Sequence, residues 1–145
     1  MKVLVDTCVW SLALRRRDLV ASSAHVHELS RLISDYRVVV TGAIRQELLS
    51  GIRDPAQFRK VERHLRAFPD LPMESRDYVT AAQFFNQCRA CGIQGSNTDF
   101  LICAVAARHR LAIYTTDRDF TGFAQHLPIT LHEPTQPAPS INTPT

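Results

Sequence analysis

Three short, uninterrupted runs of apolar and β-branched residues, far apart in the chain, restrict the fold more than any other feature. They are Lys2–Val5, Arg37–Thr41 and Leu111–Thr115. Continuous apolar strands of this kind are expected when helices cover both faces of a parallel sheet. Because helical patterns fill the chain between these runs, the order of elements predicts an α/β fold with right-handed crossovers.

The intervening segments carry helical periodicity and local signals at their ends. Asp54 followed by Pro55 is a typical helix start, Ser75 is placed to cap another helix, and Gly92 stands where a left-handed helix end is expected. Ile129–Leu131 adds a short last strand. The predicted helices are Trp10–Arg17, Ser23–Asp35, Gly42–Gly51, Asp54–Phe68, Ser75–Cys91 and Asn97–Arg110.

A chain of 145 residues predicts one domain. We place that domain at residues 1–132 and expect residues 133–145, which include four prolines, to form a disordered tail. The longest apolar run, Phe100–Ala107, is far shorter than the roughly 20 residues of a membrane-spanning helix, so no membrane association is expected. With no secretory signal pattern at the N-terminus, we expect a cytoplasmic protein with reduced cysteines.

Four acidic residues follow, or lie close behind, the predicted strands. Asp6 ends the first strand, Glu47 lies in the helix after the second, Asp99 is in the first turn of its helix, and Asp117 follows the strand ending near Thr115. In open α/β sheets the carboxyl ends of the strands meet at one edge, where ligands bind. The four carboxylates can therefore gather there.

Gathered carboxylates repel one another unless a cation neutralises them, and hard oxygen ligands favour Mg²⁺, with Mn²⁺ as a substitute. The whole chain has 17 basic and 14 acidic residues, so the remainder is distinctly basic once these four acids are set aside. A negative pocket in basic surroundings suits a polyanion held by arginines, with a metal ion at its scissile phosphate. Candidate phosphate contacts are Arg15–Arg17 and the row Arg59, Arg63 and Arg66, whereas aromatic patches near these basic helices are not evident.

Each acid also has a purely local interpretation. Asp6 can cap the following helix, Glu47 can face solvent, and Asp99 can complete a capping box with Ser96. Asp117 can be a turn residue, while the spacing Thr116-x-x-Asp119 makes Asp119 the better structural cap. We favour Asp117 over Asp119 as the functional acid because it directly follows the strand.

Four segments together resemble the PIN-domain ribonucleases, and among them the VapC-type toxins of bacterial toxin–antitoxin pairs. No single segment is specific, but their order and intervals match. The segments are Val3–Trp10, Gln46–Arg53, Asn97–Ala104 and Tyr114–Phe120.

The resemblance implies a PIN-like α/β/α sandwich with a small central parallel sheet, and a Mg²⁺-dependent endoribonuclease that acts as a toxin. It implies RNA as the substrate, a small cognate antitoxin and a homodimer. By position, Asp6 and Asp99 are implied as principal metal ligands, and Glu47 and Asp117 complete the set. Thr7 is implied as the hydroxyl that orients the site, and Cys8 departs from the Ser or Asn that is frequent there.

Two alternatives accompany this prediction. A non-catalytic RNA-binding or partner-binding module could use the same fold, although it would gain nothing from carboxylates facing phosphates. Cys88 and Cys91 have the spacing of a redox or zinc pair, but they lie at the C-terminal end of a helix, where thiolates are disfavoured. We interpret them as packing residues or as a partly exposed pair. We assign Trp10, Phe84, Phe85 and Phe100 to the core rather than to base stacking.

Overall fold

A computed structural model describes residues 1–15 and 19–134, with the side chains of residues 19–23 outside that description. Arg16 and Arg17 of the predicted basic run therefore lie outside the described residues, as does nearly all of the predicted tail. Within the described residues no helix combines the length and apolar character needed to cross a membrane.

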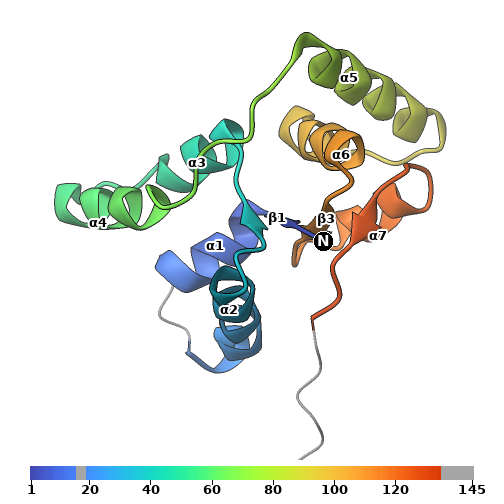
Figure 1. The fold of residues 1–145 in the computed structure, drawn as a ribbon. Coiled ribbons are helices and arrows are strands. Elements are labelled where there is room, and N and C mark those ends of the chain that lie inside the picture. Colours follow the sequence, from blue (N-terminus) through green and yellow to red (C-terminus); the bar gives the residue numbers. More distant parts are fainter. Residues whose placement is uncertain (16–18, 135–145) are drawn as a thin grey trace, which may run out of the picture.

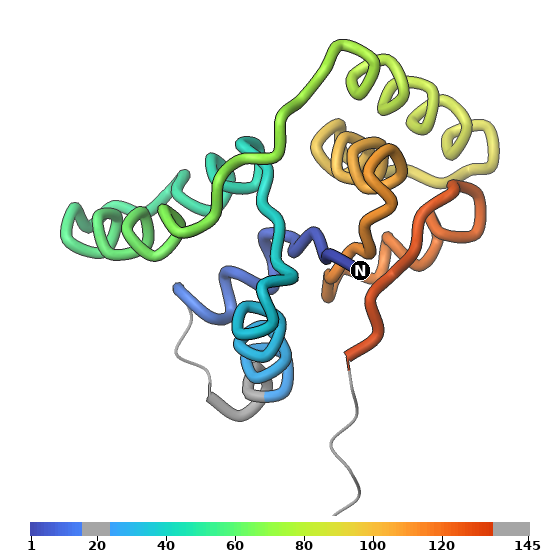
Figure 2. Tube along the Cα trace, viewed as in Figure 1, coloured from blue at the N-terminus to red at the C-terminus, as the bar shows by residue number. Residues whose placement is uncertain are grey.

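The predicted parallel sheet is confirmed. Its strands are β1 (Val3–Val5), β2 (Val38–Val39), β3 (Ala112–Tyr114) and β4 (Thr130–Leu131), and they lie in the order β2-β1-β3-β4 with every pairing parallel. Figure 2 shows β1 near the middle of the molecule, beside segments from much later in the chain. Because the chain leaves β1 to form β2 on one side and later returns to form β3 on the other, the β1/β3 boundary is the topological switch point of the sheet.

Helices surround this sheet on both sides (Figure 1). The first two lie on one side of the sheet, α5 packs along α6 on the other, and α3 and α4 extend outward next to α1. The described helices are α1 (Thr7–Leu14), α2 (Leu19–Ser34), α3 (Gly42–Leu49), α4 (Pro55–Leu65), α5 (Ser75–Ala90), α6 (Asn97–His109) and α7 (Asp119–Ala124).

The core explains why the strands read as continuous apolar runs. All three residues of β1 have no exposed surface, and β3 is likewise buried on both faces. Trp10, Phe84 and Phe100 are in the core as predicted, while Phe85 packs against it and is partly buried. Cys88 is buried and Cys91 exposed, and both are free thiols.

Local capping chemistry accounts for where several helices differ from prediction. Helix α1 begins at Thr7 rather than Trp10 because the Asp6 side chain caps it. Helix α5 begins at the predicted Ser75, but Glu74 is its N-cap residue and the Asp77 carboxylate accepts the Glu74 N–H at 2.8 Å. The short helix α7 was not predicted at all.

Candidate functional site

Asp6 is the central side chain at the carboxyl edge of the sheet. It directly follows β1 and is only 7% exposed. Its Oδ1 accepts the backbone N–H of Thr7 at 2.8 Å, and its Oδ2 accepts the hydroxyl of Thr115 at 2.9 Å. Every hydrogen bond that this carboxylate receives from the described residues comes from an uncharged donor.

Thr115 connects this carboxylate to the end of β3. Its hydroxyl donates to Asp6 and accepts the backbone N–H of Asp117 at 3.0 Å. Sequence analysis did not single out this residue. The signal for it lies in the strand register, because Val5 is paired with Tyr114 and the next residue on each strand is therefore Asp6 or Thr115.

Cys8 is the second side chain against Asp6 that sequence analysis left without a role. Its Sγ lies 3.6 Å from Asp6 Oδ2 and 3.4 Å from the Thr115 hydroxyl, and it accepts the backbone N–H of Thr116 at 3.3 Å. The thiol thus makes polar contacts in the place where Ser or Asn was expected.

Thr7 does not supply the orienting hydroxyl that the family resemblance implied. Its Oγ1 is buried without a hydrogen-bond partner in the described part of the chain, and only its backbone N–H reaches Asp6. The hydroxyl that orients Asp6 comes instead from Thr115, because the turn into α1 directs the Thr7 backbone toward the carboxylate.

Three of the predicted acids influence one another electrostatically. Burial raises the pKa of Asp6, and the negative charge of Asp99 raises it further against the lowering effect of the Thr115 and Thr7 hydrogen bonds. Glu47 lies at the surface of α3, where loss of solvation raises its pKa and the charges of Asp6 and Asp99 add to the rise. The end of β1, the last turn of α3 and the first turn of α6 thus place Asp6, Glu47 and Asp99 near enough for their charges to interact, and we call this group of three carboxylates the acidic pocket.

Asp99 serves a local structural role as well. Its Oδ2 accepts the Ser96 N–H at 3.2 Å, and the Ser96 hydroxyl accepts the Asp99 N–H at 3.1 Å, which is the predicted capping box of α6. Within the described residues Oδ1 receives no hydrogen bond. One carboxylate oxygen therefore caps the helix while the other is left for a ligand.

Asp117 is placed differently from the other three. It is exposed, and its Oδ1 accepts the Asp119 N–H at 2.9 Å at the start of α7. Its charge is not among the causes of the raised pKa of Asp6 or Glu47. The capping acid is thus Asp117 rather than Asp119, the reverse of what the Thr116-x-x-Asp119 spacing suggested, because the chain turns into α7 one residue after Asp117.

The donor set of this pocket suits a hydrated divalent cation. Among the side chains that the structure describes, no three from His, Cys, Asp and Glu are arranged to hold a metal ion together. Mg²⁺, however, keeps several of its waters and needs only one or two protein carboxylates. Asp6 and Asp99 could bind such an ion directly, with Glu47 reaching it through water, and the ion would offset the repulsion that raises the Asp6 and Glu47 pKa values.

Solved structures share this fold over nearly the whole chain at low sequence identity. FitAcB from Neisseria gonorrhoeae aligns with a TM-score of 0.72 and 22% identity, covering 91% of this chain and 97% of that one. VapBC2 from Rickettsia felis, solved bound to a DNA fragment from their promoter, aligns with a TM-score of 0.73 and 14% identity. The alignment covers 91% of this chain and 98% of that one. VapBC-1 from nontypeable Haemophilus influenzae gives 0.71 and 15%, covering 94% and 100%.

Comparison with protein families places the chain more directly than these structural likenesses do. No curated protein matched it significantly. The PIN domain model matches residues 3–125, a span that begins at β1, includes Asp6, Glu47, Asp99 and Asp117, and ends just after α7. The sheet order, the acidic pocket at the switch point and this match agree, and the chain belongs to the PIN domain family.

Proposed function

We propose that this protein is a metal-dependent endoribonuclease and the toxin of a bacterial toxin–antitoxin pair. The observation that carries the proposal is the buried Asp6 carboxylate, which shares a pocket with Glu47 and Asp99 and has no cationic hydrogen-bond donor among the described residues. A buried charge left in this state calls for a cation from outside the chain.

The residues divide the work by their positions. Asp6 and Asp99 would hold Mg²⁺ or Mn²⁺, and Glu47 would contact the ion through water. Thr115 fixes the orientation of Asp6 through its hydroxyl. Asp117, whose Oδ1 caps α7, is the predicted acid least coupled to this set, because its charge is not among the causes of the raised Asp6 or Glu47 pKa. When bound, the metal ion supplies an activated water and stabilises the charge that develops on the phosphate. No side chain forms a covalent intermediate in this scheme.

A cognate antitoxin is part of the proposal. The FitAB and VapBC proteins share the fold of this chain, and the family resemblance implies a small partner that neutralises the toxin. Expression of this chain alone should arrest bacterial growth, and co-expression of a short neighbouring reading frame should restore it. Growth that is unaffected by the chain alone would contradict the toxin role.

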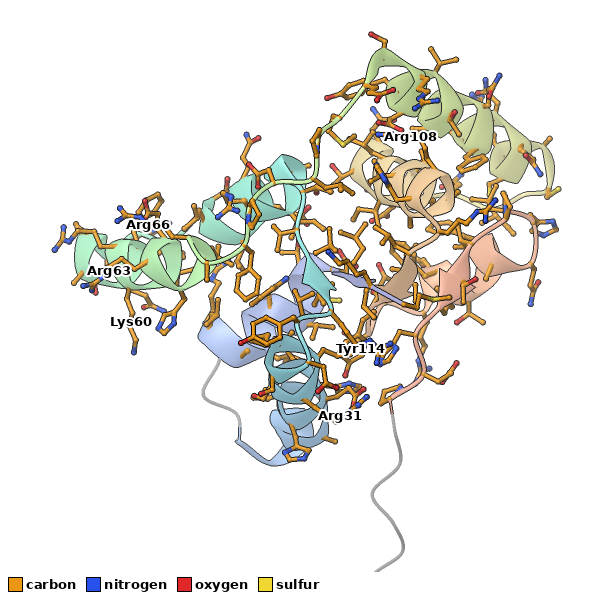
Figure 3. All side chains as sticks on the ribbon, viewed as in Figure 1. Arg31, Lys60, Arg63, Arg66, Arg108 and Tyr114 are labelled. Carbon is orange, nitrogen blue, oxygen red and sulfur yellow. The ribbon has the colours of Figure 1, made fainter. Side chains whose placement is uncertain are left out.

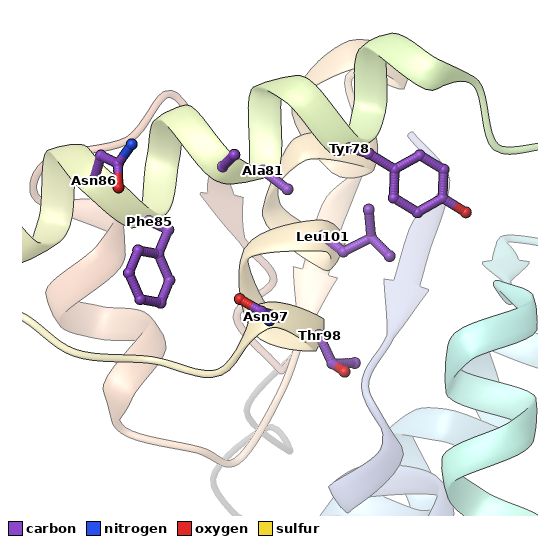
Figure 4. A pocket seen from close by; sticks show the side chains of 8 residues that line it. Tyr78, Ala81, Phe85, Asn86, Asn97, Thr98 and Leu101 are labelled. Atoms are coloured by element: carbon purple, nitrogen blue, oxygen red, sulfur yellow. The ribbon is translucent and has the colours of Figure 1, made fainter.

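A second copy of the chain is the other partner that we propose. Residues of α5 and α6 line an apolar hollow of about 460 Å³, in which Leu101 lies beside the 56% exposed Tyr78 and Phe85 lies farther along α5 (Figure 4). An exposed apolar hollow of this kind is typical of an interface. The wild-type protein should sediment as a dimer and Tyr78→Arg as a monomer; a monomeric wild type would remove this part of the proposal.

The non-catalytic alternative has one observation in its favour, which is that no three metal-binding side chains in the described residues are preassembled. Purified protein incubated with structured RNA, with and without Mg²⁺ or Mn²⁺, separates the two functions. The enzyme produces metal-dependent cleavage products, whereas a binding module shifts the RNA without cutting it.

Variants then connect cleavage to the pocket. Loss of a residue that only supports a metal ligand lowers metal affinity or activity by about 10- to 100-fold. Because Asp6 and Asp99 are proposed as the ligands themselves, Asp6→Asn and Asp99→Asn should each reduce the rate of cleavage by at least about 100-fold. The matched control is Asp35→Asn, which removes an exposed carboxylate directly after the end of α2 that pairs with Arg31 at 3.5 Å. Circular dichroism verifies folding, and cleavage by Asp6→Asn at the wild-type rate would refute the assignment.

A further inference from the structure

Helix α4 carries a basic surface outside the acidic pocket. Arg59, Arg63 and Arg66 recur at intervals of about one helical turn, and with Phe58 and Glu62 they line one hollow of about 240 Å³. Figure 3 shows Arg63 and Arg66 on this helix, which extends away from the sheet. We call these five residues the α4 face.

Two guanidinium groups of the α4 face lack a carboxylate partner. Arg66 pairs with Glu62 at 2.8 Å, but neither Arg59 nor Arg63 forms an ion pair within the part of the chain that the structure describes. Arg45, by contrast, is held by Asp70, and Arg108 by Asp77. The hollow therefore keeps a net positive charge directed at solvent.

An exposed aromatic ring accompanies these charges. Phe58 precedes Val61 and Leu65 at helical intervals, yet they are 1% exposed and Phe58 is 39% exposed. Sequence analysis found no aromatic patch near the basic helices, and Phe58 is a single exposed ring rather than a patch. The ring borders the buried side of α4 and remains open to a planar ligand.

We propose that the α4 face binds single-stranded RNA, with a base stacked on Phe58 and neighbouring phosphates bound by Arg59 and Arg63. Grooves that combine cationic side chains with aromatic rings are how proteins hold single strands without reading their sequence. In a duplex the faces of the bases are stacked on one another and cannot contact Phe58. The carboxylates of an acidic protein segment would bind the arginines but would not account for the exposed ring. The α4 face thus selects unpaired RNA.

The position of α4 relates this surface to the acidic pocket. Helix α4 packs against α3, which carries Glu47 in its last turn. Glu47 and the α4 face thus belong to neighbouring helices, and we infer that one RNA strand spans both. This inference rests on the proposed nuclease function and adds the form of RNA and a second contact region to it.

Binding can be measured separately from cleavage. Full-length Asp6→Asn protein, in EDTA, is titrated against a fluorescent 12-nucleotide oligouridylate, and against an abasic oligonucleotide of the same length, by fluorescence anisotropy. Because stacking on an aromatic ring is worth about 1–3 kcal/mol per base, Phe58→Ala should weaken oligouridylate binding by roughly 5- to 150-fold. Binding of the abasic strand should not change, and Phe58→Tyr should retain affinity for both.

Phosphate contacts made by the arginines should appear in the salt dependence of RNA affinity. Each phosphate contact contributes about 0.7 to the slope of log affinity against log salt for single strands, so Arg59→Gln/Arg63→Gln should reduce the slope by about 1.4 for both oligonucleotides. Arg76→Gln/Arg89→Gln on α5 removes the same number of charges, although Arg76 pairs with Glu74 at 2.6 Å, and serves as the charge control. The aromatic control is Tyr36→Asn, at a position 90% exposed. Neither control should alter binding, and thermal melting verifies that every variant folds.

The outcomes separate this inference from the proposed function. Unchanged oligouridylate binding in both sets of α4 variants, or equal loss for the abasic strand in Phe58→Ala, overturns the inference even if wild-type cleavage is intact. Stronger competition from poly-L-glutamate than from oligouridylate would identify an acidic protein as the occupant instead. If the α4 variants lose RNA binding but wild-type protein never cleaves RNA, the inference stands and the nuclease function fails.

Discussion

Two buried carboxylates of this protein, Glu28 and Asp6, have partners of different charge and pKa values shifted in opposite directions. Glu28 on α2 is 3% exposed and receives two bonds from Arg31, at 2.6 and 3.1 Å, and a contact from His132 at 2.8 Å. These partners lower the pKa of Glu28 to about 2, the Arg31 hydrogen bond most of all. Asp6 is similarly buried, at 7% exposure. Burial raises its pKa, and its uncharged hydrogen-bond donors do not offset that rise.

The difference identifies which carboxylate is complete within the chain. Glu28 fastens α2 to the end of β4, and Asp77, at 1% exposure, is held by Arg108 in the same manner. Both are structural ion pairs whose cation the protein supplies. The charged groups that act on Asp6 are other acids, and under the proposed function its neutralising charge is that of the metal ion.

Addition of a divalent cation should therefore stabilise the protein through the acidic pocket. At 100 times the dissociation constant a site-bound ion adds about 2.7 kcal/mol to the free energy of unfolding, which corresponds to a rise of roughly 5–10 °C in Tm. Differential scanning calorimetry with Mg²⁺ and Mn²⁺ measures it. Asp6→Asn should abolish the rise and Glu28→Gln should retain it. An equal rise in Asp6→Asn would place the ion elsewhere.

Loss of charge at the two carboxylates should change stability unequally. Glu28→Gln breaks bonds to a charged partner, which are worth about 1.5–3 kcal/mol, and we expect the lower end of this range because Arg31 can turn to solvent. Asp6→Asn retains an efficient N-cap and relieves repulsion, so its free energy of unfolding should fall by less than about 0.5 kcal/mol or rise. Urea denaturation in EDTA measures the free energy of unfolding of both variants. A larger loss of stability in Asp6→Asn than in Glu28→Gln would contradict this prediction.

The same pair should respond to pH in opposite directions. The pKa of Glu28 falls from 4.5 to about 2 on folding, so its contribution is complete above pH 4.5 and disappears as the pH falls toward 2. The stability gap between wild type and Glu28→Gln should close over that interval. The pKa of Asp6 lies above its ordinary 3.8, so ionised Asp6 destabilises the fold as the pH rises past that value. As the pH rises past 3.8, the free energy of unfolding of Asp6→Asn should therefore increase relative to that of wild type.

The sequence was sufficient for the framework of the fold and for the gathering of three acids. Strands buried on both faces leave continuous apolar runs such as Val3–Val5, and each capping residue acts within a few positions of itself. Strand ends converge at one edge of a parallel sheet, which is why Asp6 and Asp99 could be placed together. These are consequences of local pattern and topology.

What could not be predicted depends on register and on exact side-chain placement. The Thr115 bond to Asp6 exists because β1 and β3 align Val5 with Tyr114, and no periodicity in either strand specifies that alignment. Helix α7 has six residues and no capping side chain on Arg118, so its pattern is too short to recognise. The exposure of Phe58 depends on how far α4 extends beyond the core.

Removal of the Thr115 hydroxyl should weaken metal binding without unfolding the protein. Thr115→Val takes away the only hydroxyl hydrogen bond to Asp6 in the described residues, and we expect the Kd for Mn²⁺, measured by electron paramagnetic resonance, to rise about 10-fold. Thr115→Ser restores the hydroxyl and should restore affinity, which a purely structural role of the γ-methyl group would not do. An unchanged Kd in Thr115→Val would show that burial and the Thr7 and Cys8 contacts hold Asp6 in place without the hydroxyl.

The smallest effect should come from Asp117, the acid that the structure separates from the others. Asn retains the cap on the Asp119 N–H, and the charge of Asp117 is not among the causes of the raised Asp6 pKa, so Asp117→Asn should change the Kd for Mn²⁺ by less than about 3-fold. Asp117→Ala, which loses the cap, should cost about 1 kcal/mol of stability with the same small change in affinity. If Asp117→Asn instead weakens Mn²⁺ binding as much as Asp6→Asn does, Asp117 is a direct ligand, and the boundary between structural and ligand-binding carboxylates has to be redrawn to include the start of α7.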